Sequence, residues 1–128
     1  MRSEKGRMKE NVIVDKSKKF ALRIIRMYRY LCDKKKEFVL SKQVLRSGTS
    51  IGANVREAER GQSKADFMAK MSIALKEADE TLYWLELLHE SDLLSANEFS
   101  GIYNDGQEIV RILVSITQTS KRKLYGRQ

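Results

Sequence analysis

Residues 40–90 carry the pattern that decides the fold, and they read LSKQVLRSGTSIGANVREAERGQSKADFMAKMSIALKEADETLYWLELLHE. Apolar residues recur every three or four positions on both sides of a short polar break, which is typical of two amphipathic helices. The first is predicted over residues 37–60, with a face that comprises Leu40, Val44, Ser47, Ile51, Val55 and Ala58. The second follows Ser63, a favourable N-cap residue, and keeps its apolar face as far as Leu88. Two long helices joined by so short a loop are expected to pack antiparallel.

A further helix is predicted before this pair and another after it. The apolar stripe of the earlier helix, spaced 4, 3 and 4 residues apart, comprises Phe20, Ile24, Met27 and Leu31. The later helix opens with a capping box formed by Ser95 and Glu98.

The last helix contains one strong turn signal, Asn104-Asp105-Gly106. Its apolar phase nevertheless passes through this tripeptide unchanged, because Ile102, Ile109 and Ile116 are seven residues apart. We therefore expect one continuous helix with a weak point at Gly106, where a neighbouring helix can approach closely.

The chain of 128 residues contains no proline, although an average composition would include about six. This absence permits long uninterrupted helices, and no segment indicates a strand hairpin. We predict an all-α fold, an antiparallel up-down four-helix bundle that forms a single domain over residues 1–128. Residues 1–11 are expected to form a flexible basic arm, and residues 124–128 a flexible basic tail.

Few side chains are suited to catalysis or to metal binding. Cys32 is the single cysteine and His89 the single histidine, which excludes an intramolecular disulfide and a cysteine-based zinc site. Glu86 and His89 supply one copy of the Glu-x-x-His pattern that a di-iron bundle requires twice. We therefore expect no catalytic residues, no metal, no cofactor and no enzymatic activity.

Apolar runs in this chain are all shorter than the roughly 18 residues that a membrane span requires. Residues 1–10 are charged and lack the apolar segment of a secretory signal. Together with the lone cysteine, these features favour a cytoplasmic protein without a membrane partner.

Charge is the remaining functional signal, because the formal net charge is +8 and unevenly distributed. Residues 1–36 hold 13 Lys and Arg against 4 Asp and Glu, residues 37–100 hold 7 against 11, and residues 101–128 hold 5 against 2. Two basic ends around an acidic middle suit contact with a phosphate backbone. The candidate nucleic-acid-binding residues are Lys16, Lys19, Arg23, Arg26, Arg29, Lys121, Arg122 and Lys123.

Two other interpretations of these charges stay open. The basic residues can form an ordinary solvated face with a solubilising tail. They can also meet the acidic third helix of another subunit, and all three interpretations are mutually compatible.

Several stretches of the chain resemble a known family. The second helix contains Leu40-x-x-Gln43-x-x-Arg46-Ser47-x-x-Ser50-Ile51-x-x-Asn54-Val55-x-Glu57, and the third contains Asp66-Phe67 and Ser72-Ile73-Ala74-x-x-x-Glu77-x-x-x-Thr81-Leu82. The first helix adds Lys16-Ser17-x-x-Phe20-Ala21-x-x-Ile24-Ile25-x-x-Tyr28. Together they resemble the bacterial four-helix bundle family known as the 23S rRNA intervening-sequence proteins. That family's pattern usually continues Asn-Ile-x-Glu-Gly, whereas this chain has Val55 and Ala58 at the Ile and Gly positions.

The resemblance implies a non-enzymatic four-helix bundle that assembles as a homopentamer with a central channel. A related branch serves as the accessory protein of diversity-generating retroelements, where a basic surface engages nucleic acid and a reverse transcriptase. The favoured hypothesis is therefore an oligomeric bundle that binds RNA or DNA through basic surfaces. The alternative is a scaffold that recruits a polymerase-type or other protein partner.

The matching residues also form a polar strip along the second helix, which comprises Arg46, Ser47, Ser50, Asn54 and Glu57. Buried polar groups require hydrogen-bond partners. We therefore expect this strip to bond across helices or between subunits, as a structural element rather than a ligand site.

Overall fold

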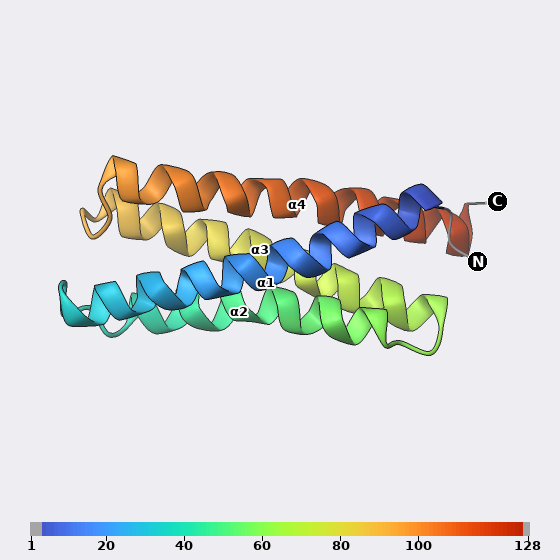
Figure 1. Ribbon diagram of the computed structural model, residues 1–128, viewed down its shortest axis with the longest axis horizontal. Helices are drawn as coiled ribbons and strands as arrows, with labels where there is room; N and C mark the ends of the chain where they lie inside the picture. The colour runs from blue at the N-terminus through green and yellow to red at the C-terminus, as the bar shows by residue number, and fades with distance from the viewer. Residues whose placement is uncertain (1–3, 127–128) are drawn as a thin grey trace.

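The structure, a computed structural model, describes residues 4–126 as four long helices joined by short loops (Figure 1). The helices are α1 (Glu4–Asp33), α2 (Leu40–Glu59), α3 (Lys64–Glu90) and α4 (Ala96–Tyr125). The described part of the chain contains no strand. The prediction of an all-α four-helix bundle is therefore confirmed.

Each helix packs antiparallel against two neighbours. Helix α2 lies between α1 and α3, α4 also contacts both α3 and α1, and within residues 4–126 the backbones of diagonally opposite helices do not approach each other closely. Across α1 and α4, Lys9 meets Ser115 and Arg23 meets Asp105, so the two helices run in opposite directions. The start of α1, the α2–α3 loop and the end of α4 consequently lie together at one end of the bundle (Figure 1).

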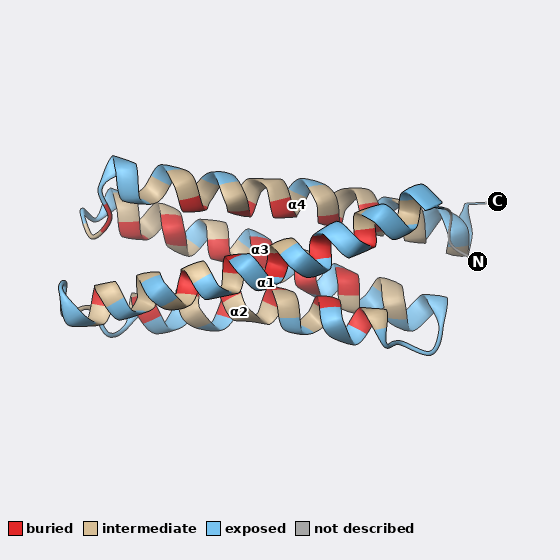
Figure 2. Cartoon of the chain, in the orientation of Figure 1, coloured by how far each residue is buried: buried red, intermediate tan, exposed pale blue. Residues whose placement is uncertain are grey.

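The core runs along the inner faces of all four helices, where buried residues recur about once per turn (Figure 2). Burial of one such aliphatic side chain stabilises the fold by about 1.5–3 kcal/mol. The completely buried side chains include Ile13, Ile24, Leu31, Ile51, Met71, Leu85, Leu88 and Leu113.

Two glycines bring neighbouring helices unusually close. A Cβ atom added at Gly48 would lie 2.8 Å from Cγ1 of Ile24, and one at Gly106 would lie 2.8 Å from Cδ2 of Leu82. Helix α4 continues through Gly106 without interruption. The prediction of a continuous last helix is confirmed, and the glycine there serves close packing.

Side-chain caps define the start of each helix after the first. Ser63 accepts a hydrogen bond from the Asp66 backbone N–H at 3.0 Å, as the sequence predicts. Ser95 and Glu98 form the predicted capping box, with N–O distances of 3.2 and 2.8 Å. Both helix starts therefore follow from local sequence alone.

The predicted start of α2 at Glu37 is wrong by three residues. Glu37 precedes the helix, and its carboxylate accepts hydrogen bonds from the backbone N–H groups of Val39, Leu40 and Ser41. Burial opposes ionisation of Glu37, but these three donors outweigh it and lower the pKa of the carboxyl group. A glutamate three residues upstream thus caps the helix that it was expected to begin.

The expected flexible arm over residues 1–11 is wrong from Glu4 onward, because α1 already begins there. Ile13 is completely buried and Glu10 is buried one turn earlier, so packing against the bundle supports this part of α1. Of the expected flexible tail over residues 124–128, Tyr125 is the last residue of α4 and Gly126 follows it. Residues 1–3 and 127–128 lie outside the described part of the chain.

Candidate nucleic-acid interface

Three predicted basic residues of α1 are paired with carboxylates. Lys16 Nζ lies 2.9 Å from Glu108 Oε1, and Arg23 Nη1 lies 2.6 Å from Asp105 Oδ2, both across the contact with α4. Lys19 pairs with Asp15 one turn earlier in α1, at 3.0 Å. The hydrogen bond and the charge of Glu108 raise the pKa of Lys16. These cations are therefore partly neutralised before any ligand arrives.

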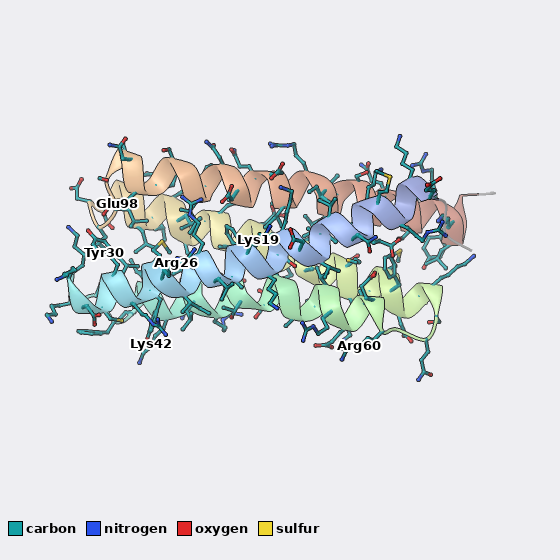
Figure 3. The ribbon with its side chains drawn as sticks, in the orientation of Figure 1. Lys19, Arg26, Tyr30, Lys42, Arg60 and Glu98 are labelled. Atoms are coloured by element: carbon teal, nitrogen blue, oxygen red, sulfur yellow. The ribbon has the colours of Figure 1, made fainter. Side chains whose placement is uncertain are left out.

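Arg26 and Arg29 are exposed and form no ion pair within residues 4–126. They lie towards the C-terminal end of α1, and Figure 3 shows Arg26 in the region of Tyr30 and Glu98. The Ser95 backbone N–H and the Tyr30 hydroxyl hold the pKa of the Glu98 carboxyl group below its ordinary value. This ionised glutamate offsets part of the positive charge at that end.

Lys121, Arg122 and Lys123 lie at the opposite end of the bundle, because α4 runs antiparallel to α1. All three are exposed, and none forms an ion pair in the described residues. The predicted cations therefore do not form one continuous surface; the structure separates them into a paired middle and two ends.

Three further lysines join the C-terminal group, although the charge pattern of the sequence did not single them out as site residues. Lys5 and Lys9 come from the first turns of α1, and Lys64 is the first residue of α3. Lys9 donates to the neutral hydroxyl of Ser115 at 2.6 Å, so its charge has no carboxylate partner there. We call this group the basic end, and it comprises Lys5, Lys9, Lys64, Lys121, Arg122 and Lys123.

A cleft of about 730 Å³ opens at the basic end. The starts of α1 and α3, the α2–α3 loop and the end of α4 form its walls. Its basic lining residues are Lys5, Arg7, Lys9, Lys64, Arg122 and Lys123, and its acidic ones are Glu10 and Glu59. Positive charge around a concave surface concentrates the field and attracts anions.

The floor of this cleft is mainly apolar, although the buried side chain of Glu10 also lines it. Phe67 is half-buried, and Ala58 and Ile116 are buried in the core directly beneath. Ser63 and Gln62 of the α2–α3 loop add hydrogen-bonding groups to the wall. The cleft therefore combines a cationic rim with a base that is apolar apart from Glu10.

The polar strip of α2 lies at the edge facing α3, and Ser47 is its one fully buried member. Thr81 donates to Ser47 at 2.9 Å inside the bundle. Near the surface, Arg46 pairs with Glu77 at 3.3 Å and also with Glu80.

The remaining members of the strip are only partly covered or exposed. Glu57 pairs with Lys70 of α3 at 2.8 Å. Ser50 and Asn54 donate to backbone carbonyls one turn earlier in α2 itself. The expectation of a buried strip bonded across helices therefore holds for Ser47, while Arg46 and Glu57 bond across to α3 at the surface.

The residues weighed for catalysis have structural partners. Nδ1 of His89 lies 2.9 Å from the Leu94 carbonyl oxygen, and its ring stacks on Phe99 with centroids 4.4 Å apart. Glu86 accepts a hydrogen bond from Tyr103 at 2.6 Å, which raises the pKa of Tyr103 to about 12. Cys32 contacts the Ser41 hydroxyl at 3.8 Å.

Neither a metal site nor a membrane span is evident in residues 4–126. No three His, Cys, Asp or Glu side chains in this range are grouped as metal ligands. No helix in this range is both long enough and apolar enough to cross a bilayer.

These features define a class: an antiparallel four-helix bundle with a basic cleft at the end where α1 begins and α4 ends. The chain belongs to the 23S rRNA-intervening sequence protein family, whose model matches residues 9–115. It is similar to the crystal structure of a protein with unknown function from the S23 ribosomal protein family of Bacteroides thetaiotaomicron VPI-5482. The two are 55% identical with a TM-score of 0.85, over 86% of this chain and 98% of that one. A comparison with curated proteins finds no match.

Proposed function

We propose that this protein binds RNA or DNA, without catalysing a reaction, and that the basic end makes the main phosphate contacts. The observation that carries the proposal is the convergence of six cations from α1, α3 and α4, none of which has a carboxylate partner in an ion pair within residues 4–126. Phosphate contacts of this kind release counterions and make affinity fall steeply with salt.

The test is binding of fluorescein-labelled 20-nucleotide RNA and DNA strands, measured by anisotropy at several salt concentrations. The triple variant Lys64→Glu, Arg122→Glu, Lys123→Glu should bind at least about tenfold more weakly at 0.1 M salt. Its plot of log affinity against log salt should be flatter by about 2, because three single-strand phosphate contacts are lost.

The matched control is Lys34→Glu, Lys42→Glu, Lys76→Glu, which makes the same change in net charge at exposed lysines elsewhere. Figure 3 shows Lys42 at the other end of α2 from Arg60, and therefore far from the basic end. Equal losses in the two variants would contradict the proposal that the basic end is the contact surface. If the affinity of the wild-type protein does not change with salt concentration, the proposal of phosphate contact is contradicted altogether.

A second candidate function is recruitment of a protein partner such as a reverse transcriptase. The observation that favours it is the exposure of Phe38 and Val39, which are 51% and 71% exposed in the α1–α2 loop. Exposed neighbouring apolar residues are typical of interaction sites. A pull-down that survives nuclease treatment and is lost in Phe38→Ser, Val39→Ser would support this role.

We also propose that the protein forms a homo-oligomer, with a pentamer as the state that the family resemblance implies. The acidic surface of α3 in one copy and the basic N- and C-terminal segments of a second copy carry complementary charges. Light scattering of the full chain, in low and high salt, measures the mass directly and tests the contribution of charge.

A further inference from the structure

We infer that the cleft at the basic end holds one unpaired nucleotide of a nucleic-acid strand, with the base on the apolar floor and the phosphate at the cationic rim. This inference rests on the proposed function and goes further, because it assigns a ligand unit and a position to the binding. It follows from three properties of the cleft: its size, its combination of apolar and cationic surfaces, and two cations, Lys64 and Arg122, that form no ion pair within residues 4–126.

The size suits a single nucleotide. The volume of about 730 Å³ falls within the range of about 300–1,000 Å³ that is typical of small-molecule sites. A base within a duplex is covered above and below by its neighbours and cannot enter such a site. The cleft should therefore distinguish single strands from duplexes.

The chemistry of the cleft matches both parts of a nucleotide. Phe67 offers an aromatic surface at the floor, and bases stack on aromatic side chains in single-strand binding proteins. Lys64 is three residues earlier in α3, and Arg122 faces the same cleft from α4. A purely anionic ligand would leave the apolar floor uncovered, and a purely apolar one would leave Lys64 and Arg122 without partners.

Two positions in the rim are available for a phosphate. Lys64 and Arg122 are both exposed, and neither takes part in an ion pair in residues 4–126. An arginine offers a planar group with five N–H donors, which binds phosphate in a bidentate manner. The first turn of α3 begins at the same wall, and its positive end adds to the attraction.

The experiment compares three 12-nucleotide ligands of equal charge per strand: a thymidine strand, an abasic strand and a fully paired duplex. The full chain should bind the thymidine strand about tenfold more tightly than the abasic strand, because only the former can stack a base. In Phe67→Leu this ratio should fall close to one while affinity for the abasic strand stays unchanged. Tyr83→Leu is the matched control, because it removes an exposed aromatic ring from α3 outside the cleft.

A second measurement does not depend on the folding of a variant. A strand carrying 5-iodouracil, irradiated with the wild-type protein, should crosslink to peptides containing the cleft residues 5–10, 58–67 or 116–123. Crosslinks confined to other parts of the chain would overturn the inference. Equal affinity for thymidine and abasic strands would also overturn it, while leaving salt-dependent binding and hence the proposed function intact.

Two competitors test the choice of ligand. If adenosine monophosphate binds as tightly as the thymidine strand, the assignment to a strand is wrong. The assignment is also wrong if a polyglutamate peptide of equal charge binds as tightly as the strand. Failure of all strands to bind at any salt concentration would instead contradict the proposed function itself.

Discussion

Helix α1 packs closely on small residues of α2, whereas its contact with α4 adds ion pairs and a lysine–hydroxyl hydrogen bond to an apolar core that includes Phe20. On the α2 side, Gly48 leaves room for Ile24 to approach the backbone. On the α4 side, Lys16 pairs with Glu108 and Arg23 pairs with Asp105. We call these contacts the α1–α2 seam and the α1–α4 seam.

The difference shows why basic residues on one helix do not share one role. Lys16 and Arg23 in the α1–α4 seam face carboxylates on the neighbouring helix, which partly neutralise their charge. Cations beyond the seam, such as Lys64 and Arg122, face solvent and the cleft. We therefore expect the α1–α2 seam to dominate stability and the basic end to dominate ligand binding.

The largest effect is expected from Ile24→Ala in the α1–α2 seam. Ile24 is completely buried, so its truncation should lower the free energy of unfolding by about 2–5 kcal/mol. Urea denaturation followed by circular dichroism measures the change. Leu22→Ala, at a neighbouring position that is 48% exposed, should change stability by less than about 0.5 kcal/mol.

Substitutions at two glycines of α2 test how closely the two helices approach each other in the α1–α2 seam. Gly48→Ala should destabilise the protein by about 1–3 kcal/mol, because the new methyl group would overlap the side chain of Ile24. Gly52→Ala is the control, since its Cβ would lie 3.4 Å from Ser17 Oγ, an ordinary contact. Higher helix propensity should make that variant equal to wild type or about 0.5–1 kcal/mol more stable. Equal losses in both would contradict a local close approach at Gly48.

At the end of the α1–α2 seam, Glu37→Gln should lower stability at pH 7 by about 0.5–2 kcal/mol, because the ionised cap is lost. Folding lowers the pKa of Glu37, so its contribution is present above the ordinary value of 4.5. The contribution is lost as the pH falls through the lower pKa of the folded state. The difference in unfolding free energy between wild type and variant should therefore disappear in acid, and a difference that stays constant with pH would contradict the capping role.

The smallest effect on stability is expected in the α1–α4 seam, from Asp105→Asn with Glu108→Gln. Both ion pairs are substantially exposed, so their loss should cost less than about 1 kcal/mol. The same change releases Lys16 and Arg23, and affinity for a 20-nucleotide strand should rise about threefold or more at low salt. Asp79→Asn with Glu90→Gln makes an equal charge change on α3, and an equal gain there would show that net charge alone is responsible.

Local sequence is sufficient to predict the helices wherever an apolar stripe and a cap coincide. Ser63 and Ser95 cap their helices as expected, because each side chain meets a backbone N–H only three residues away. The first turns of α1 lack such a stripe and are stabilised by packing against distant parts of the chain. Glu37 is a second position where local sequence was insufficient. It was predicted to be the first residue of a helix, whereas its carboxylate caps a helix that begins after it.

The amino-acid sequence by itself determined an all-helical bundle of this family with two basic chain ends, because helix periodicity, capping and net charge are local or additive properties. The tertiary structure alone decided which cations are free. Lys16 and Arg23 meet their partners on a helix more than 80 positions away, and Lys64 joins Arg122 only because α3 begins where α4 ends. Charge pairing depends on separations of a few ångströms, and those separations are set by the packing of the whole chain.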